Sequence, residues 1–198
     1  MTELLIATHN RGKLREIQAI LSDLRLTLLT PDDLGLTLEV VEDGLTYAEN
    51  AAKKAVLHAK AGGLPTLADD SGLEVEALGG APGIYSARYA PKAGASDADR
   101  RAYLLQNLAD KPRPWKARFC AAVAVALPEG NVRIANGECA GVIIPEERGL
   151  NGFGYDPIFL LPEIGKTMAE LDEGDKNRIS HRARALQNAR PILEEWLF

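Results

Sequence analysis

The sequence predicts an α/β protein with an elongated, mixed β-sheet flanked by helices. Strand-like and helix-like apolar patterns alternate along the N-terminal half of the chain. Two long strand-like runs, 117–127 and 132–144, are joined by Pro-Glu-Gly-Asn, which is typical of a hairpin. No repeat, low-complexity segment or linker interrupts the chain, so we expect a single domain over residues 1–198.

The first elements follow from the spacing of apolar residues. Residues 4–8 predict a buried strand, and apolar residues at helical spacing predict a helix from about Arg11. A second strand is expected at 26–29. Residues 46–61 predict a helix with a face of small residues, and the two glycines that follow are a helix stop.

The middle of the chain predicts two short strands and a capped helix. Residues 64–68 predict a short buried strand, which the turn-forming pair Ser71-Gly72 is expected to end. Strict alternation over 73–78 predicts a half-exposed strand. Ser96 marks the start of a helix, because Asp99 follows three residues later as in a capping box.

The C-terminal part predicts one more strand, at 157–161, and a closing helix. The helix is expected from about His181, and Lys176 is expected at its start. Proline lacks the amide donor that a helix interior requires, so the helix should be kinked or divided at Pro191.

Composition limits the classes of function. The apolar fraction of 46% and the charged fraction of 26% are those of an ordinary globular protein. A net charge of −5 argues against a nucleic-acid-binding protein, which usually carries a basic domain. We expect neither a signal peptide nor a membrane helix, since the apolar runs are too short. Cys120 and Cys139 match no metal-binding spacing and predict buried thiols in a reducing cytoplasm.

Two adjacent carboxylates, Asp69 and Asp70, directly follow an apolar run. At a strand end such a pair repels and loses hydration, which a hard divalent cation such as Mg²⁺ offsets. A carboxylate that does not ligate the metal directly can act as a general base on water. The alternative is that the pair caps a helix or a turn. Glu42 is a candidate third oxygen donor or a solvated loop acid, and Glu39 and Asp43 lie close to it.

A candidate phosphate site lies between the first strand and the first helix. A hydroxyl, an amide side chain, a lysine and the amides of a helix N-terminus together suit a phosphate. The segment consists of Thr8, His9, Asn10, Arg11, Gly12 and Lys13. Its spacing is not that of a Walker loop. Helix capping by Thr8 or Asn10 is the alternative.

Two further groups suit a nucleotide. The segment Gly152-Phe153-Gly154-Tyr155-Asp156-Pro157 places two aromatic rings among glycines, which suits stacking on a nucleobase. A turn with buried aromatic rings is the alternative. Lys176 and the run Ser180-His181-Arg182 combine a lysine for phosphate with donors for a carbonyl-rich ring. A basic helix start at the surface is the alternative there.

Five motifs together resemble the inosine triphosphate pyrophosphatase (Ham1/RdgB-type) family. They occur in the family's order and span nearly the whole chain: Thr8-x-Asn10-x-x-Lys13, Ala68-Asp69-Asp70-Ser71-Gly72-Leu73, Gly80-Ala81-Pro82-Gly83-Ile84-Tyr85-Ser86-Ala87-Arg88, Phe153-Gly154-Tyr155-Asp156-Pro157 and Ser180-His181-Arg182. The resemblance implies a homodimeric, Mg²⁺-dependent enzyme of mixed α/β fold. It also implies hydrolysis of ITP, dITP and XTP to the monophosphate and pyrophosphate, which cleanses the nucleotide pool.

The resemblance also implies roles for individual positions. Asp70 corresponds to the general base and a metal-site carboxylate, and Glu42 and Asp69 correspond to the other metal-site acids. The segment 8–13 and Lys176 correspond to the triphosphate-binding positions. The remaining implied substrate contacts are Ser71, Phe153, Gly154, Tyr155, Asp156, His181 and Arg182, the last two at the base.

The expected reaction is attack of water on the α-phosphorus, with pyrophosphate leaving. Hypoxanthine and xanthine present a carbonyl at position 6, where adenine presents an amino group. Donors from His181 and Arg182 would pair with that carbonyl, so ITP and XTP should be preferred over ATP. A broader-specificity triphosphate phosphatase and a non-catalytic nucleotide-binding sensor stay open as alternatives. Neither nucleic acid nor a membrane is an expected partner.

Overall fold

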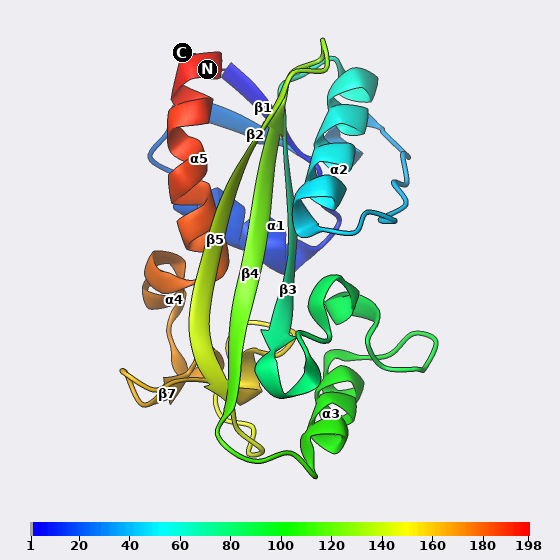
Figure 1. Ribbon diagram of the computed structural model, residues 1–198. Coiled ribbons are helices and arrows are strands. Elements are labelled where there is room, and N and C mark those ends of the chain that lie inside the picture. The colour runs from blue at the N-terminus through cyan, green and yellow to red at the C-terminus, as the bar shows by residue number, and fades with distance from the viewer. Residues whose placement is uncertain (1) are drawn as a thin grey trace. The chain divides into compact units, whose positions relative to one another are not determined.

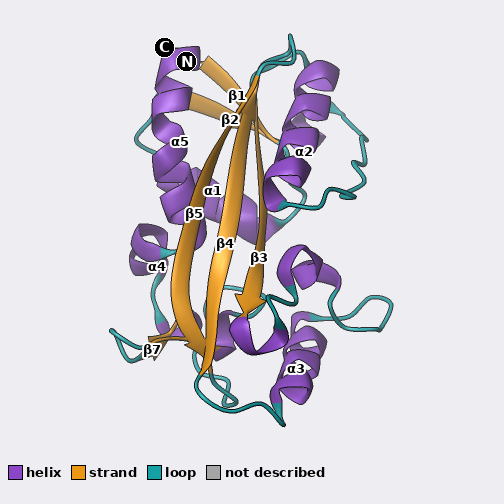
Figure 2. Ribbon diagram, in the orientation of Figure 1, coloured by secondary structure: helices purple, strands orange, loops and turns teal. Residues whose placement is uncertain are grey.

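The computed structural model describes residues 2–198 and contains one seven-stranded sheet in the order β2-β1-β3-β4-β5-β6-β7 (Figure 1). Strand β1 pairs in parallel with β2 and β3, whereas β6 pairs antiparallel with β5 and β7. The predicted α/β class with a mixed sheet is therefore confirmed (Figure 2). The strands are β1 Thr2–Ile6, β2 Leu26–Leu29, β3 Thr66–Val75, β4 Trp115–Ala126, β5 Val132–Ile143, β6 Phe159–Leu161 and β7 Lys166–Thr167.

The chain forms two compact units, and strands β3, β4 and β5 each contribute residues to both. Unit 1 comprises Met1–Asp70, Ala121–Gly137 and His181–Phe198. Unit 2 comprises Ser71–Cys120 and Glu138–Ser180. The α-helices of unit 1 are α1 Arg11–Ile20, α2 Tyr47–Gly62 and α5 His181–Leu197, and those of unit 2 are α3 Asp97–Leu108 and α4 Glu173–Ile179.

The core of unit 1 follows from the two-residue period of β4. Residues Ala121, Val123 and Val125 lie in one apolar cluster with residues of α1 and α5. Their neighbours at 122, 124 and 126 are alanines that lie in a second cluster with α2. Successive side chains of a strand point to opposite faces. The helices α1 and α5 therefore cover one face of this part of the sheet, and α2 covers the other (Figure 1).

Helix α2 packs through alanines, as its sequence predicts. Ala51, Ala55 and Ala59 are completely buried and share a cluster with Ala7, which directly follows β1, and with alanines of β3 and β4. The Thr46 side chain accepts a hydrogen bond from the amide of residue 49 at the N-terminus of the helix. Gly63 ends the helix with a φ of +64°, a left-handed conformation that glycine adopts without a steric penalty.

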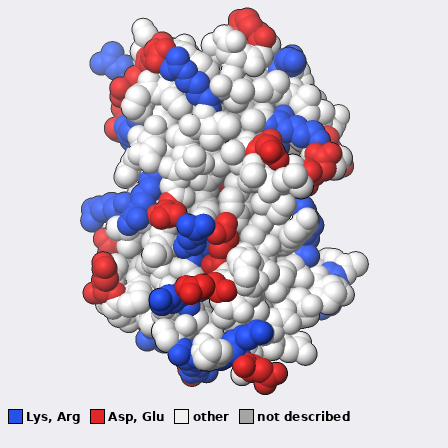
Figure 3. Space-filling view, viewed as in Figure 1, with Lys and Arg blue, Asp and Glu red and all other residues white. Residues whose placement is uncertain are grey.

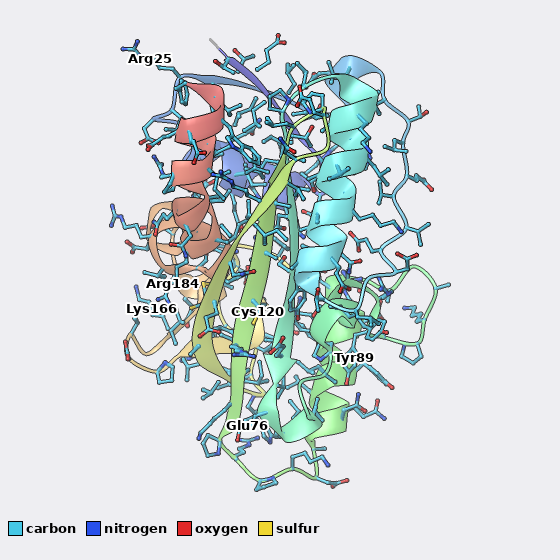
Figure 4. All side chains as sticks on the ribbon, turned by 45° about the horizontal axis from the view of Figure 1, so that its top comes forward. Arg25, Glu76, Tyr89, Cys120, Lys166 and Arg184 are labelled. Carbon is cyan, nitrogen blue, oxygen red and sulfur yellow. The ribbon has the colours of Figure 1, made fainter. Side chains whose placement is uncertain are left out.

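Unit 2 has its own apolar cluster, in which the rings of Phe119 and Phe159 lie 4.4 Å apart between centroids. Helix α3 begins with the predicted capping box of Ser96 and Asp99. Cys120 of β4 (Figure 4) is half-buried, and burial together with nearby Glu74 raises the pKa of its thiol to about 12. At neutral pH the thiol is therefore protonated and a poor nucleophile.

The structure corrects the predicted turn at Ser71-Gly72, because β3 continues through it to Val75. Leu73 and Val75 are completely buried in the apolar cluster of unit 2. The amide of Leu73 donates to the Ser86 hydroxyl at 2.8 Å, so a side chain satisfies part of the extended backbone. Burial of these side chains thus outweighs the local turn preference.

Helix α5 begins at His181, as predicted, but the expected division at Pro191 and the expected place of Lys176 at the start of this helix are wrong. Helix α5 is continuous through Pro191, since it buries Leu186 and Ala189 before the proline and Leu193 and Leu197 after it. Lys176 does not belong to this helix but to the last turn of the separate helix α4, where a cation is favourable. None of the described helices is long and apolar enough to cross a membrane.

The alanine interface of α2 generates a stability prediction. Ala55→Leu adds three carbons where Ala55 has no exposed surface, so overpacking should lower the free energy of unfolding by about 1–3 kcal/mol. Ala61→Leu, at an exposed position of the same helix, is the matched control and should change it by less than about 0.5 kcal/mol. Urea denaturation of both variants measures the effect. Equal stability of Ala55→Leu and wild type would contradict the packing described here.

Candidate active site

The two adjacent aspartates of β3 point to opposite faces of the strand, as neighbouring strand residues must. Asp69 contacts Lys13 of α1 and Arg182 of α5, whereas Asp70 contacts Asn50 and Lys54 of α2. The carboxylates therefore do not share one set of partners. Their mutual repulsion, expected from the sequence, is reduced by this geometry.

Asp69 lies in a buried ion-pair chain. Its Oδ1 atom is 2.6 Å from Lys13 Nζ and 3.3 Å from Arg182 Nη2, and its side chain has no exposed surface. Arg182 also bonds to the buried carboxylate of Glu16. Burial alone would raise the pKa of Asp69, but Arg182 and Lys13 outweigh it and hold this pKa far below its usual range. Asp69 is therefore an ionised anchor for Lys13 and Arg182.

Asp70 is buried but far less completely paired than Asp69. Its Oδ2 atom accepts a hydrogen bond of 3.2 Å from Asn50, and its Oδ1 atom is 3.5 Å from Lys54 Nζ. Burial raises the pKa of Asp70 above its usual value, although Lys54 and Lys13 act in the opposite direction. A carboxylate with a raised pKa is a better proton acceptor, as a general base requires.

Lys54 joins Glu42 to Asp70. Its ammonium group is 2.6 Å from Glu42 Oε1 and also donates to the Asp69 carbonyl at 2.8 Å. The neighbouring acid Asp43 pairs instead with Lys53 at the surface, at 2.6 Å. Of the two acids, Glu42 is thus the one that contacts the same cation as Asp70.

The oxygen donors in unit 1 have the chemistry that Mg²⁺ prefers. Glu42 and Asp70 converge on the single positive charge of Lys54. Mg²⁺ commonly uses one or two carboxylates together with waters and phosphate oxygens. Across residues 2–198 the structure has no group of three or more His, Cys, Asp and Glu side chains arranged to hold a metal ion. The predicted role of Asp69 as a third metal-site acid stays a prediction.

The segment 8–13 runs from the connection after β1 into the first turn of α1, and the capping alternative for Asn10 is confirmed. The Asn10 side chain accepts hydrogen bonds from the amides of Gly12 and Lys13, at 2.9 and 3.0 Å. The Thr8 hydroxyl accepts from the Asn10 amide at 3.1 Å. His9 and Arg11 are exposed. The cap fixes the start of α1, from which Lys13 reaches Asp69.

In unit 2 the predicted aromatic loop contains a buried ion pair. Asp156 Oδ2 is 2.5 Å from Lys176 Nζ and accepts a hydrogen bond of 2.9 Å from the Phe153 amide. The Lys176 ammonium lies 4.9 Å from the centre of the Phe153 ring. At Gly152 an added Cβ would come within 2.1 Å of Asp156 Oδ2, so glycine is required there. One loop thus presents a partly exposed ring next to a lysine.

The other predicted contacts have different surroundings. Tyr155 is buried, and its hydroxyl donates to the Ser86 carbonyl at 2.9 Å, as the buried-aromatic alternative predicts. Ser71 is half-buried on β3 in unit 2. His181, the first residue of α5, is buried in unit 1. Arg182 has 1% exposed surface, and within unit 1 its guanidinium donates hydrogen bonds to the carboxylates of Glu16 and Asp69.

Sequence reasoning missed three residues that surround the aspartates: Asn50, Lys54 and Glu16. The first two lie four residues apart on α2, and Asn50 is buried on the face that the alanines occupy. A polar side chain on an otherwise apolar helix face could have indicated these residues, because a buried polar group requires a hydrogen-bond partner. Glu16 gave a similar signal, being a buried acid in α1 one residue from the core residue Ile17.

Comparisons with known proteins agree with these motifs. The model of the Ham1 family matches residues 4–192. The dITP/XTP pyrophosphatase of Geobacter sulfurreducens is 51% identical over 187 residues, which are 94% of this chain and 94% of that protein. A dITP/XTP pyrophosphatase of Thermus thermophilus is 48% identical over 195 residues, which are 98% of this chain and 91% of that protein.

A solved structure gives the same result for the fold. The HAM1 protein from Coxiella burnetii matches with a TM-score of 0.89 and 42% sequence identity, over 98% of this chain and 100% of that one. The family model covers more than half of the chain, and the relatives match it nearly end to end. The chain therefore belongs to the Ham1 family.

Proposed function

We propose that this protein is a nucleoside-triphosphate pyrophosphohydrolase that cleaves non-canonical purine nucleotides to the monophosphate and pyrophosphate. The observation that carries the proposal is the unequal pairing of the two aspartates. Asp69 contacts two cations directly, whereas Asp70 has one distant lysine and an amide. Adjacent carboxylates in different environments take different roles. The relatives named dITP/XTP pyrophosphatases supply the substrate class.

In this proposal Asp70 accepts the proton of the water that attacks the α-phosphorus. The water–phosphorus bond forms while the bond to the bridging oxygen breaks, and pyrophosphate leaves with that oxygen. Burial lowers the pKa of Lys13, and Asp69 opposes this shift and holds the lysine in place, where it would neutralise phosphate charge. Glu42 would hold Mg²⁺, which when bound supplies Lewis-acid stabilisation of phosphate oxygens, and Asp70 would lie at the metal site without ligating the metal directly.

Unit 2 carries further residues that we propose to bind a nucleotide. Phe153 offers a partly exposed ring for stacking, and Lys176 offers a buried positive charge for phosphate. Lys176 already bonds to Asp156, so the carboxylate positions the lysine as Asp69 positions Lys13 in unit 1. Both proposed phosphate ligands thus share one design, in which a buried aspartate orients a lysine.

Base selection by His181 and Arg182 stays a prediction. Arg182 forms ion pairs with Glu16 and Asp69, and Asp69 also pairs with Lys13. A change at Arg182 would therefore disturb Lys13 through Asp69. Replacement of Arg182 would therefore affect the hydrolysis of every triphosphate as well as any discrimination between bases.

Homodimerisation and a cytoplasmic location are further parts of the proposal. On the face drawn in Figure 3, acidic and basic side chains are interspersed, without a continuous basic field of the kind that nucleic-acid binding requires. In unit 2, Arg118 lies between Glu74 and Glu138 on three neighbouring strands, at 2.8 and 3.2 Å. Basic and acidic side chains thus pair with one another on this sheet face as well.

The reaction products test the proposed function. With Mg²⁺ and ITP in water enriched in heavy oxygen, we expect pyrophosphate and IMP, with the label on IMP because attack is at the α-phosphorus. ITP and XTP should react faster than ATP, and a chelator should abolish turnover until Mg²⁺ is restored. Mass spectrometry locates the label. Orthophosphate with IDP would indicate a broader phosphatase, and nucleotide binding without turnover would indicate a sensor.

Substitution of the proposed base gives a second test. Asp70→Asn keeps the size of the side chain but removes its proton affinity, so kcat should fall by about 10²–10⁴-fold. Asp43→Asn removes an exposed carboxylate paired with Lys53 and is the matched control, with activity close to wild type. Steady-state kinetics on ITP at saturating Mg²⁺ compare the variants. A folded Asp70→Asn protein with wild-type kcat would contradict the assignment.

A further inference from the structure

A long irregular loop, residues 144–155, carries Phe153 in unit 2. Loops of this length without regular structure are usually functional and need fixed points of attachment. Its middle is fixed to the 3₁₀ turn at 168–170 and the residue after it. The Asn151 amide donates to the Ala169 carbonyl at 3.1 Å, and its side chain donates to the Leu171 carbonyl at 2.9 Å.

Helix α3 holds the loop next to Phe153. Asp97 Oδ2 accepts a hydrogen bond of 2.7 Å from the Gly154 amide, and Arg101 Nη1 donates to the Gly154 carbonyl at 2.8 Å. The same guanidinium forms a two-pronged ion pair with Glu147, at 2.8 and 2.9 Å. Two side chains one helical turn apart therefore hold both polar groups of a single residue, and one of them also reaches the beginning of the loop.

These contacts are more than α3 needs for its own stability. The helix N-terminus is already capped by Ser96 and Asp99, so Asp97 is not required as a cap. The Arg101 side chain has 12% exposed surface, which makes its bonds better shielded than those of an ordinary surface arginine. The Gly154 amide belongs to the peptide plane that joins this residue to Phe153, and the Gly154 carbonyl belongs to the next plane, so the two contacts fix the backbone on both sides of Gly154.

We propose that Asp97 and Arg101 are positioning residues that hold Phe153 in the orientation in which its ring binds the purine base. The inference rests on the proposed function and deepens it, because it assigns base binding in unit 2 to a clamp on the backbone. Neither residue touches the reacting phosphate in this proposal. A ring that contacts the base equally in substrate and transition state changes KM and leaves kcat unaltered.

The test compares variants that remove the clamp with one that removes a similar ion pair elsewhere in unit 2. Arg101→Met and Asp97→Ala should each raise KM for ITP about tenfold, since a charge-assisted hydrogen bond is lost, and change kcat less than about twofold. Arg101→Lys keeps one donor and should recover most of the loss. Arg118→Met removes surface pairs with Glu74 and Glu138 and should leave KM unchanged.

Hydrogen exchange of the loop peptide gives a readout that does not depend on turnover. Faster exchange at Gly154 in Asp97→Ala, with no change in Arg118→Met, is expected. If Arg101→Met and Asp97→Ala keep the wild-type KM and the wild-type exchange rate while the wild type is active, the positioning role is contradicted and the proposed function is not. A fall in kcat at constant KM would also contradict the positioning role. A wild-type protein that releases no pyrophosphate from ITP would overturn the proposed function itself.

Discussion

Arg182 organises unit 1 because its guanidinium has almost no contact with water. Only 1% of its surface is exposed, and it lies between Glu16 of α1 and Asp69 of β3, which also holds Lys13. A buried charge is tolerated only when it is paired, and removal of one partner typically costs about 3–5 kcal/mol. This chain of ion pairs therefore fixes α5, α1 and β3 to one another within the unit, although Arg182 and Glu16 are 166 residues apart in sequence.

The consequence for the chemistry is a division of labour between two neighbouring carboxylates. The alternation of β3 directs Asp69 to this ion-pair chain and Asp70 to α2, where Asn50 and Lys54 contact it. Cations lower the pKa of Asp69, and burial raises the pKa of Asp70. In our account the first carboxylate orients a phosphate ligand and the second activates water. Identical side chains thus acquire different functions from the pleat of one strand.

Local patterns in the sequence predicted much of the fold. The features that they did not predict depend on contacts between residues far apart in the chain. The cap at Ser96 is confirmed because capping depends on a few neighbouring residues. The turn expected at Ser71-Gly72 is wrong because burial of Leu73 keeps the strand extended. For the site, motif spacing identified the aspartates, but the contact of Asp69 with Arg182 joins residues 113 positions apart and no local pattern reveals it.

Carbon NMR of carboxyl-labelled aspartate measures directly how differently Asp69 and Asp70 ionise. In metal-free protein, assigned by comparison with Asp69→Asn and Asp70→Asn, the pKa of Asp70 should lie above the ordinary value of about 3.9. The pKa of Asp69 should lie well below it, so Asp70 takes up its proton first as pH falls. Titration in the reverse order, or together, would contradict the claim that the fold separates an anchoring carboxylate from a reactive one.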